Sequence, residues 1–305
     1  HFRMDAEESV MQAHQQLQDS VLSWGNLLIA TGGSLKPSKC FYHLISSAWK
    51  HDGQWVYADN ENEEALQIVI PLPDDTLAPI EHLGVDIASK TLGSMTCPSG
   101  DTTAALHRMQ DKAQEWLDKA LNASLSRRNL WFLLDRQFWP KVGFGCCTLA
   151  ADFDTLASSL KRQYYQLLPL GGIRRSVRTE VRYLSAGFFG SGYPHLGVEC
   201  FVGQLEKLLT HYGCSTVVGR LLQSSMEMFM IELGMLTQPL QVPYASCNQW
   251  VTNSWLKSVW EKVDKFAVQV QVRNITLRPP RAGDDWLMQR FVQMGYTRKE
   301  LLRLN

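Results

Sequence analysis

The spacing of apolar residues changes at Gly100, and this change constrains the fold more than any other feature of the sequence. After Gly100, apolar residues recur every three or four positions, which is typical of one face of a helix. The first such helix carries Ala105, Met109, Ala113, Trp116 and Ala120. Further helices are expected at 126–138, 153–167, 177–184, 199–211, 219–235 and 254–266.

Before Gly100 the sequence alternates between short β-prone segments and turns, after one amphipathic helix that ends at Thr31-Gly32-Gly33. His51-Asp52-Gly53 is a tight-turn signal and predicts a hairpin between its flanking segments. The stretch from Pro71 to Pro79 is interpreted as a turn, because two prolines interrupt a strand ladder. Strands or extended segments are expected within 40–49, 54–57, 66–70, 92–96 and, after the helices, 268–272.

These patterns predict an α+β protein, in which a small β-rich unit precedes a mainly helical body. The expected divisions are residues 1–100, a helical region at 101–245 and a helical C-terminal tail at 246–305. Six tryptophans fit the apolar faces of helices and are expected in the core. They are Trp116, Trp131, Trp250, Trp255, Trp260 and Trp286.

Composition excludes several classes of protein. The chain has 305 residues, 45% hydrophobic and 20% charged, which is typical of a globular protein with a sizeable core. No apolar run approaches the about 18 residues that span a bilayer, so no membrane partner is expected. Seven irregularly spaced cysteines favour reduced thiols in an intracellular protein, either nuclear or cytoplasmic. Zero formal net charge argues against a protein that coats nucleic acid with its whole surface.

Several segments occur in the order found in reverse transcriptases of non-LTR retroelements, including those of protist genomes. Gly33–Cys40 (GSLKPSKC), between a helix and a strand, resembles motif D, and Lys90–Gly93 (KTLG) resembles the primer grip, motif E. Leu125–Arg128 (LSRR) and then Phe138–Gly145 (FWPKVGFG) resemble the thumb of these polymerases. Gly192–Val198 (GYPHLGV) resembles a degraded form of a downstream Gly-Leu-Gly-Leu segment.

The resemblance implies the end of a polymerase palm at 1–100 and a thumb and connection region at 101–245. The parent protein would be an RNA-directed DNA polymerase that uses Mg²⁺, held by adjacent aspartates on a hairpin. In the family that hairpin precedes motif D, so it should lie at or upstream of His1. Asp5 stands alone and has the spacing to Glu8 of a helix cap. We therefore expect this chain to be a fragment that binds no metal and does not polymerise DNA alone.

Two motif positions are candidate functional residues. The resemblance gives Lys39 a supporting catalytic role, in which its positive charge faces the leaving pyrophosphate. It also places the backbone of Leu92 and Gly93 close to a primer strand, an approach that glycine permits because it lacks a side chain. A solvent-facing lysine and an ordinary turn glycine are the alternative interpretations.

Basic residues of the helical region are the second set of candidates, as contacts to a nucleic-acid backbone. Arg174, Arg178 and Arg182 are spaced by four residues and would form one stripe on a helix. A solvated charged face is the alternative interpretation. The full set is Arg127, Arg128, Lys161, Arg162, Arg174, Arg175, Arg178 and Arg182.

Two other motifs are interpreted as structural. Gly283-Asp284-Asp285 matches the Gly-Asp-Asp of RNA-dependent RNA polymerases, but it precedes an expected helix and its aspartates fit a cap. His195, Cys200, His211 and Cys214 suggest zinc. On one helix, however, Cys200 and His211 would lie about 16 Å apart, too far to share one ion.

The sequence therefore predicts a chain that holds an RNA/DNA primer–template duplex, while an upstream part of the same polyprotein supplies catalysis. The alternative is a non-catalytic helical scaffold or interaction protein, such as a decayed or domesticated retroelement remnant. Zero net charge and many interior-type aromatic residues suit that alternative as well.

Overall fold

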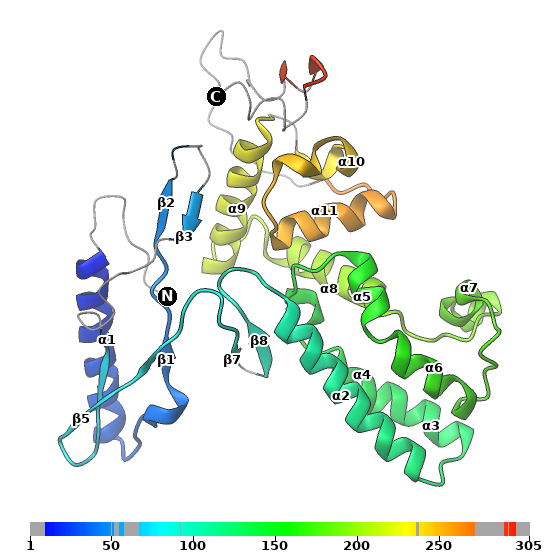
Figure 1. Ribbon diagram of the computed structural model, residues 1–305, viewed down its shortest axis with the longest axis horizontal. Helices are drawn as coiled ribbons and strands as arrows, with labels where there is room; N and C mark the ends of the chain where they lie inside the picture. Colours follow the sequence, from blue (N-terminus) through cyan, green and yellow to red (C-terminus); the bar gives the residue numbers. More distant parts are fainter. Residues whose placement is uncertain are drawn as a thin grey trace. The chain divides into compact units, whose positions relative to one another are not determined.

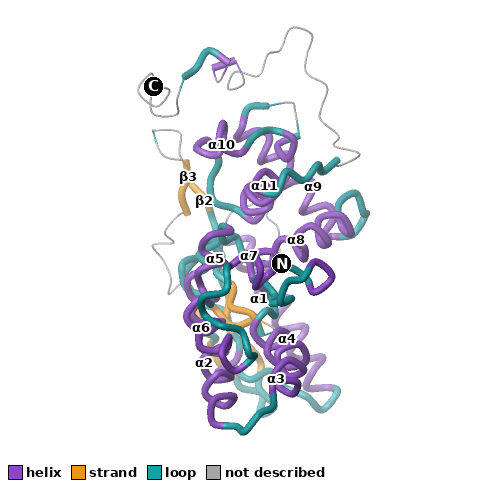
Figure 2. The backbone as a smooth tube through the Cα atoms, turned by 90° about the vertical axis from the view of Figure 1, so that its right-hand side faces the viewer, coloured by secondary structure: helices purple, strands orange, loops and turns teal. Residues whose placement is uncertain are grey.

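The computed structural model describes residues 10–49, 51, 55–57, 67–91, 93–235, 238–271, 290–291 and 293–296. It shows a mostly helical α+β protein, in which the strands are short and form small two-stranded sheets (Figures 1 and 2). The chain divides into two compact units. Unit 1 comprises residues 1–89 and 97–99, and unit 2 comprises residues 90–96 and 100–305.

Unit 1 is built on the long N-terminal helix α1 (Val10–Ala30), which packs against strand β4 (Val69–Pro71). The Gln18 side chain joins them, because it both donates to and accepts from the Val69 backbone at 2.9 Å. Trp24, which belongs to the apolar stripe of this helix, is 56% exposed. The small core contains Tyr42, Ile68, Ile70 and Ile80, with Leu17, Val21 and Leu35 packed against it.

The hairpin predicted around the His51 turn is confirmed by β2 (Ser47–Trp49) and β3 (Trp55–Tyr57), which pair antiparallel with Ala48 opposite Val56. The start of the 40–49 segment does not join this hairpin. Phe41–Tyr42 (β1) instead pairs in parallel with Glu81–His82 (β6). A parallel partner so distant in sequence leaves no local signal, which is why the pattern did not predict it.

The interpretation of Pro71–Pro79 as a turn alone was wrong. β4 and β5 (Leu77–Pro79) form an antiparallel ladder that includes both prolines, with Pro71 opposite Leu77 and Val69 opposite Pro79. Each proline ends its strand in a two-stranded sheet, where a residue without an N–H group is tolerated. The turn itself is shorter, with Asp75 at φ 62° and Leu72 N donating to Thr76 O.

The first core of unit 2 forms around α2 (Thr103–Asn122). The predicted apolar face of this helix is buried, and Trp116 packs edge-on against Phe138 at 5.1 Å between ring centres. Helices α3 to α6 contribute buried residues to this core, and the half-buried Tyr183 of α7 packs against it. Their bounds are α3 Arg127–Leu133, α4 Trp139–Val142, α5 Phe153–Ser159, α6 Lys161–Leu170 and α7 Thr179–Tyr183, and the hairpin strands β7 Ser89–Thr91 and β8 Ser94–Thr96 precede them.

The second core of unit 2 forms where α9 (Val217–Leu233) and α11 (Trp255–Lys265) pack on one another, with the Phe229 and Trp260 rings edge-on at 5.5 Å. This core contains residues from both the helical region expected at 101–245 and the tail expected at 246–305. The remaining helices here are α8 Leu196–His211 and α10 Tyr244–Cys247.

Two predicted helices are interrupted. The helix expected at 153–167 breaks at the fully buried Leu160, whose backbone leaves the helical region at φ −105° and ψ 9°. The helix expected at 126–138 extends beyond Phe138 and ends at Gly143. It passes through a π-helical turn, Leu134–Phe138, in which Trp139 N donates to Leu134 O, and continues as α4. The wider turn precedes a proline that has no N–H to donate.

Three of the six tryptophans expected in the core are buried. Trp116, Trp250 and Trp260 are at most 8% exposed, and Trp131 and Trp255 are half-buried. Val268 and Val270, from the strand predicted at 268–272, lie in a segment that joins no sheet among the described residues, and Val272 lies outside the described residues. Trp286, the Asp5–Glu8 cap and Gly283-Asp284-Asp285 lie outside the described residues. None of the described helices is long and apolar enough to cross a membrane.

Candidate nucleic-acid interface

The β7–β8 hairpin of unit 2 turns through Gly93, which adopts φ +92°, whereas its neighbour Leu92 lies outside the described residues. The turn packs closely on the segment after α4. A methyl group on Gly93 would lie 3.3 Å from Phe144 Cε1, and one on Gly145 would collide with Ser94 Oγ. The fold therefore brings two segments of the family resemblance, Lys90–Gly93 and Phe138–Gly145, into contact.

Basic side chains gather beside this hairpin. Arg108 Nη1 donates to Met95 Sδ at 3.5 Å, and Lys112 Nζ donates to Lys141 O at 3.4 Å. Burial lowers the pKa of Lys112, and the charges of Arg108, Lys141 and Lys90 lower it further. Three cations thus lie close to Lys112, and the four together make this region positive. We call them the hairpin cations: Lys90, Arg108, Lys112 and Lys141.

One nearby carboxylate offsets part of this charge. Glu115 accepts from Lys119 at 2.6 Å and from Lys141 at 3.0 Å, and these hydrogen bonds lower its pKa to about 2. Glu115 is therefore ionised at any physiological pH. Because it is shared between Lys141 and the exposed Lys119, it does not neutralise Arg108 or Lys112.

A second basic region lies at the start of α6. Lys161, Arg162 and Tyr165 come from this helix and Arg175 comes from the segment that follows it, and together they line an open hollow of about 560 Å³. Arg175 Nε donates to Tyr165 O at 3.0 Å, which fixes the two segments together. No carboxylate of the described residues forms an ion pair with these three cations. We call this set the basic hollow.

Arg182 contacts two residues of the basic hollow, Arg175 and Tyr165. Its side chain is 7% exposed, with Nε donating to Val177 O at 2.7 Å and Nη2 donating to Arg175 O at 3.0 Å. Its guanidinium also lies 5.0 Å from the centre of the Tyr165 ring. A hydrogen bond from Arg182 and its charge lower the pKa of Tyr165. Arg182 therefore positions Arg175 and Tyr165 and has little surface left for a ligand.

The predicted stripe of Arg174, Arg178 and Arg182 is not formed. Helix α7 begins at Thr179, so Arg174 and Arg178 precede it and share no helix face with Arg182. Arg178 instead lies 3.5 Å from the carboxylate of Glu180. Spacing by four residues produces a stripe only where the whole segment is helical, and this segment is not.

Arg127 and Arg128 lie exposed in the first turn of α3, where Ser126 Oγ caps the helix by accepting from Asn129 N at 3.2 Å. The Arg127 side chain packs over the turn after α6, since a methyl group on Gly172 would lie 2.9 Å from Arg127 Nε. Arg127 is thus close to the segment that carries Arg175, whereas the described structure shows no contact for Arg128.

Lys39 belongs to unit 1. It is the last residue of a 3₁₀ turn, Pro37–Lys39, and strand β1 begins two residues later at Phe41. The side chain is exposed. The order of helix α1, glycine, turn, lysine and strand is the one that the resemblance to motif D implies.

In the described part of the chain, no group of three or more His, Cys, Asp or Glu side chains is placed to hold a metal ion. His195 caps α8 by accepting from Val198 N, and Cys200 Sγ donates to Cys146 O at 3.1 Å. Cys200 and His211 lie near opposite ends of α8.

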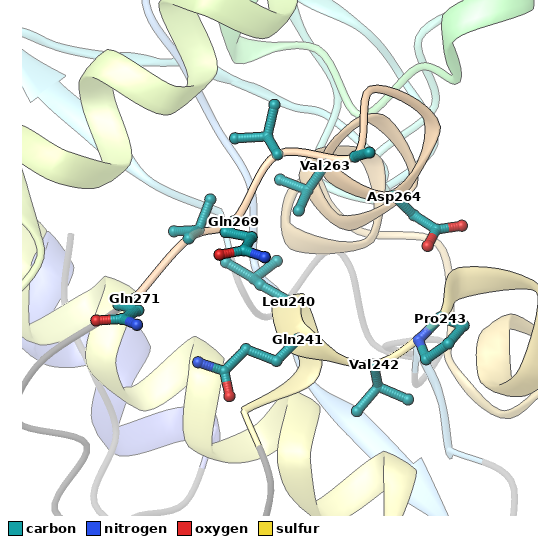
Figure 3. Close-up of a pocket in the computed structure, with 11 residues that line it drawn as sticks. Leu240, Gln241, Val242, Pro243, Val263, Asp264, Gln269 and Gln271 are labelled. Atoms are coloured by element: carbon teal, nitrogen blue, oxygen red, sulfur yellow. The ribbon is translucent and has the colours of Figure 1, made fainter.

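A further hollow, of about 460 Å³, lies between the segment before α10 and the segment after α11 (Figure 3). Asp264 is the one titratable side chain among its lining residues, and Figure 3 shows its carboxylate pointing away from Gln241. The other lining residues are apolar or glutamine. This hollow offers no pair of groups suited to acid–base or nucleophilic chemistry.

None of the four hairpin cations was among the candidate residues predicted from the sequence, although Lys90 lies within the KTLG segment. Arg108 and Lys112 are separated by four residues and flank the buried stripe of α2, and Lys141 lies within the FWPKVGFG segment. A basic pair beside an apolar stripe was the available signal, although its convergence on the hairpin is visible only in the fold. Comparison of the chain with models of protein families, with characterised proteins and with solved structures finds no match.

Proposed function

We propose that this chain holds the primer–template duplex of an RNA-directed DNA polymerase through phosphate contacts of unit 2. The basic hollow carries the proposal. Lys161, Arg162 and Arg175 converge there without carboxylate partners among the described residues, in an open space beside an aromatic ring. Cations arranged in this way attract a polyanion, because binding releases the counterions of its phosphates.

The hollow combines two elements of nucleic-acid recognition. The three cations can contact successive phosphates, which positions a strand without reading its sequence. The Tyr165 ring offers an apolar surface for a sugar or an unpaired base. Arg127, packed over Gly172, extends the positive surface from the neighbouring helix α3.

The hairpin cations support the same role at a second place on unit 2. Gly93 presents a turn without a side chain, so a backbone strand can approach it closely. Arg108 and Lys112 line one small hollow together with Gly93, and Lys90 and Lys141 lie close enough to Lys112 to lower its pKa. This combination suits a primer grip, in which the protein backbone and nearby cations hold the end of a strand.

Catalysis is assigned elsewhere in the parent protein. Phosphoryl transfer by metal ions needs paired carboxylates, and in the family that this chain resembles these are adjacent aspartates on a hairpin that precedes the motif D segment. The proposal therefore places the catalytic aspartates in an upstream part of the same polyprotein. Lys39, exposed at the end of its turn, would contribute a positive charge toward the leaving pyrophosphate.

The first test is a titration of a labelled RNA/DNA primer–template duplex with the full chain, by fluorescence anisotropy at several salt concentrations. We expect binding that weakens as salt rises. The double variant Lys161→Gln/Arg162→Gln should bind about tenfold or more weakly and reduce the slope of log K against log salt by roughly 1 to 2.

The control is Arg136→Gln/Lys207→Gln, which removes the same charge from exposed positions outside both basic regions. It should change affinity and salt slope much less. An affinity that does not change with salt concentration would contradict the proposal, and so would an equal loss of affinity in the two double variants. Absence of binding at low salt would favour the scaffold alternative.

A further inference from the structure

Helix α9 has a second apolar face, which is exposed to solvent in the described structure. Val217, Leu221, Met228 and Ile231 are 56–64% exposed. With the exposed Ser224 between them, these positions are separated by four, three, four and three residues. We call Val217, Leu221, Ser224, Met228 and Ile231 the α9 stripe.

The core of unit 2 does not account for this stripe. The opposite side of α9 already buries Met226, Phe229, Met230 and Leu233 in the second core. Exposed apolar side chains of this size carry a cost in water, and a row of them along one helix face marks a surface that binds another surface. The helix is therefore built to pack on both sides.

Alternating spacings of four and three residues are the spacing of a coiled-coil seam. An antiparallel pairing of α9 with a second α9 aligns the stripe with itself. It places Val217 opposite the partner subunit's Ile231 and Leu221 opposite the partner subunit's Met228, with Ser224 at the two-fold axis. We propose that α9 forms the antiparallel interface of a homodimer of this chain.

The charges beside the stripe select both the partner and the orientation. Arg220 directly precedes Leu221 and Glu227 directly precedes Met228, so both lie on the same flank. Neither forms an ion pair among the described residues. Antiparallel pairing brings this flank of both helices together, so Arg220 of each subunit meets the partner subunit's Glu227. Two ion pairs result from one symmetric interface.

The parallel orientation is disfavoured by the same charges. It brings opposite flanks together and sets Glu227 against the partner subunit's Glu232. The antiparallel interface uses one helix of 17 residues from each subunit, which is short. Stable interfaces bury more than about 1,200 Å² in total, so this dimer should be weak and should depend on concentration.

The test is sedimentation velocity of the full chain from micromolar to sub-millimolar concentration. The wild-type chain should pass from monomer to dimer. Arg220→Glu and Glu227→Arg should each weaken the dimer about tenfold, because each turns two attractions into two repulsions. The double variant Arg220→Glu/Glu227→Arg exchanges the charges and should restore dimerisation.

Leu221→Asp should abolish the dimer, whereas Phe132→Ser, which alters an equally exposed apolar residue on α3, should leave it intact. Circular dichroism of every variant checks that it folds, as expected for exposed positions. A wild-type chain that stays monomeric at all concentrations overturns the proposal. A double variant no better than the single ones overturns the antiparallel interface, and so does a dimer that survives Leu221→Asp.

Discussion

Lys262 is a charged side chain with no exposure to solvent, in the middle of α11. Its Nζ donates to Ala151 O at 2.8 Å, to Ser258 O at 3.1 Å and to Ser258 Oγ at 2.5 Å. It thereby connects α11 to the segment before α5. Burial lowers the pKa of Lys262, against the opposing influence of nearby groups that favour its charged form, namely Cys200, Glu261 and Asp152.

This lowered pKa predicts how stability depends on pH. Between the folded pKa of Lys262 and its ordinary value, the unfolded chain holds a proton that the folded chain lacks, so the free energy of unfolding rises with pH. Lys262→Met removes this contribution. We expect its stability relative to wild type to be greatest near neutral pH and to decline as pH rises toward about 10.

Urea unfolding of both proteins between about pH 7 and pH 10 measures this difference. Taking the difference removes the contribution of buried tyrosines, such as Tyr164, whose raised pKa values act in both proteins. A difference that stays constant over the whole range would show that Lys262 keeps its proton on folding.

The arginines after α6 show what a residue-scale pattern can and cannot predict. Lys161, Arg162 and Arg175 were candidates because basic residues are frequent there, and the fold gathers them in one hollow. Arg182 was a candidate for the same reason, but its side chain is buried and donates hydrogen bonds to backbone carbonyls. Only the path of the chain through the Gly171–Gly172 turn decides which arginine faces outward and which faces inward.

At the scale of elements, the β7–β8 hairpin depends on glycine at Gly145. This residue adopts φ +82°, and its α-carbon faces Ser94 of the hairpin. Gly100 provides a matched comparison, because it has φ +80° with no atom within 4 Å of the position a side chain would take. The two glycines have the same backbone conformation, but only Gly145 lies close to another residue, Ser94.

Alanine at each position separates the two effects. Gly100→Ala should cost about 1 kcal/mol of unfolding free energy through backbone strain alone. Gly145→Ala should cost more, since it also displaces Ser94, and it should weaken duplex binding by moving the hairpin cations. Urea unfolding and the anisotropy titration measure both. Equal costs for the two variants, with unchanged affinity, would contradict the role given to this packing.

Element existence was predictable where one face repeats along the sequence, as on α2, whose expected stripe is buried. Element ends and breaks were less predictable. Leu160 fits the apolar spacing of its segment, but tertiary packing places it between two helices. Likewise, Pro71 and Pro79 signal a turn locally, although they end two paired strands. In each example a distant contact overrides a local preference.

At the scale of the whole molecule, the pattern change at Gly100 predicted an α+β protein, which the structure confirms. The divisions at 100 and 245 and the assignment of palm and thumb stay predictions. The hairpin cations show why a site is harder to predict than a fold class. They come from β7, α2 and α4, three elements separated in sequence, and only folding brings them together.

Lysine footprinting can show whether unit 2 holds a duplex at its two basic regions, as we propose. The full chain is acetylated with and without bound primer–template, and each lysine is quantified by mass spectrometry. We expect the bound duplex to protect Lys161 in the basic hollow from acetylation, together with Lys90, Lys112 and Lys141 at the hairpin. Lys119 and Lys207 should stay reactive. Protection that is absent, or equal at all six lysines, would contradict it.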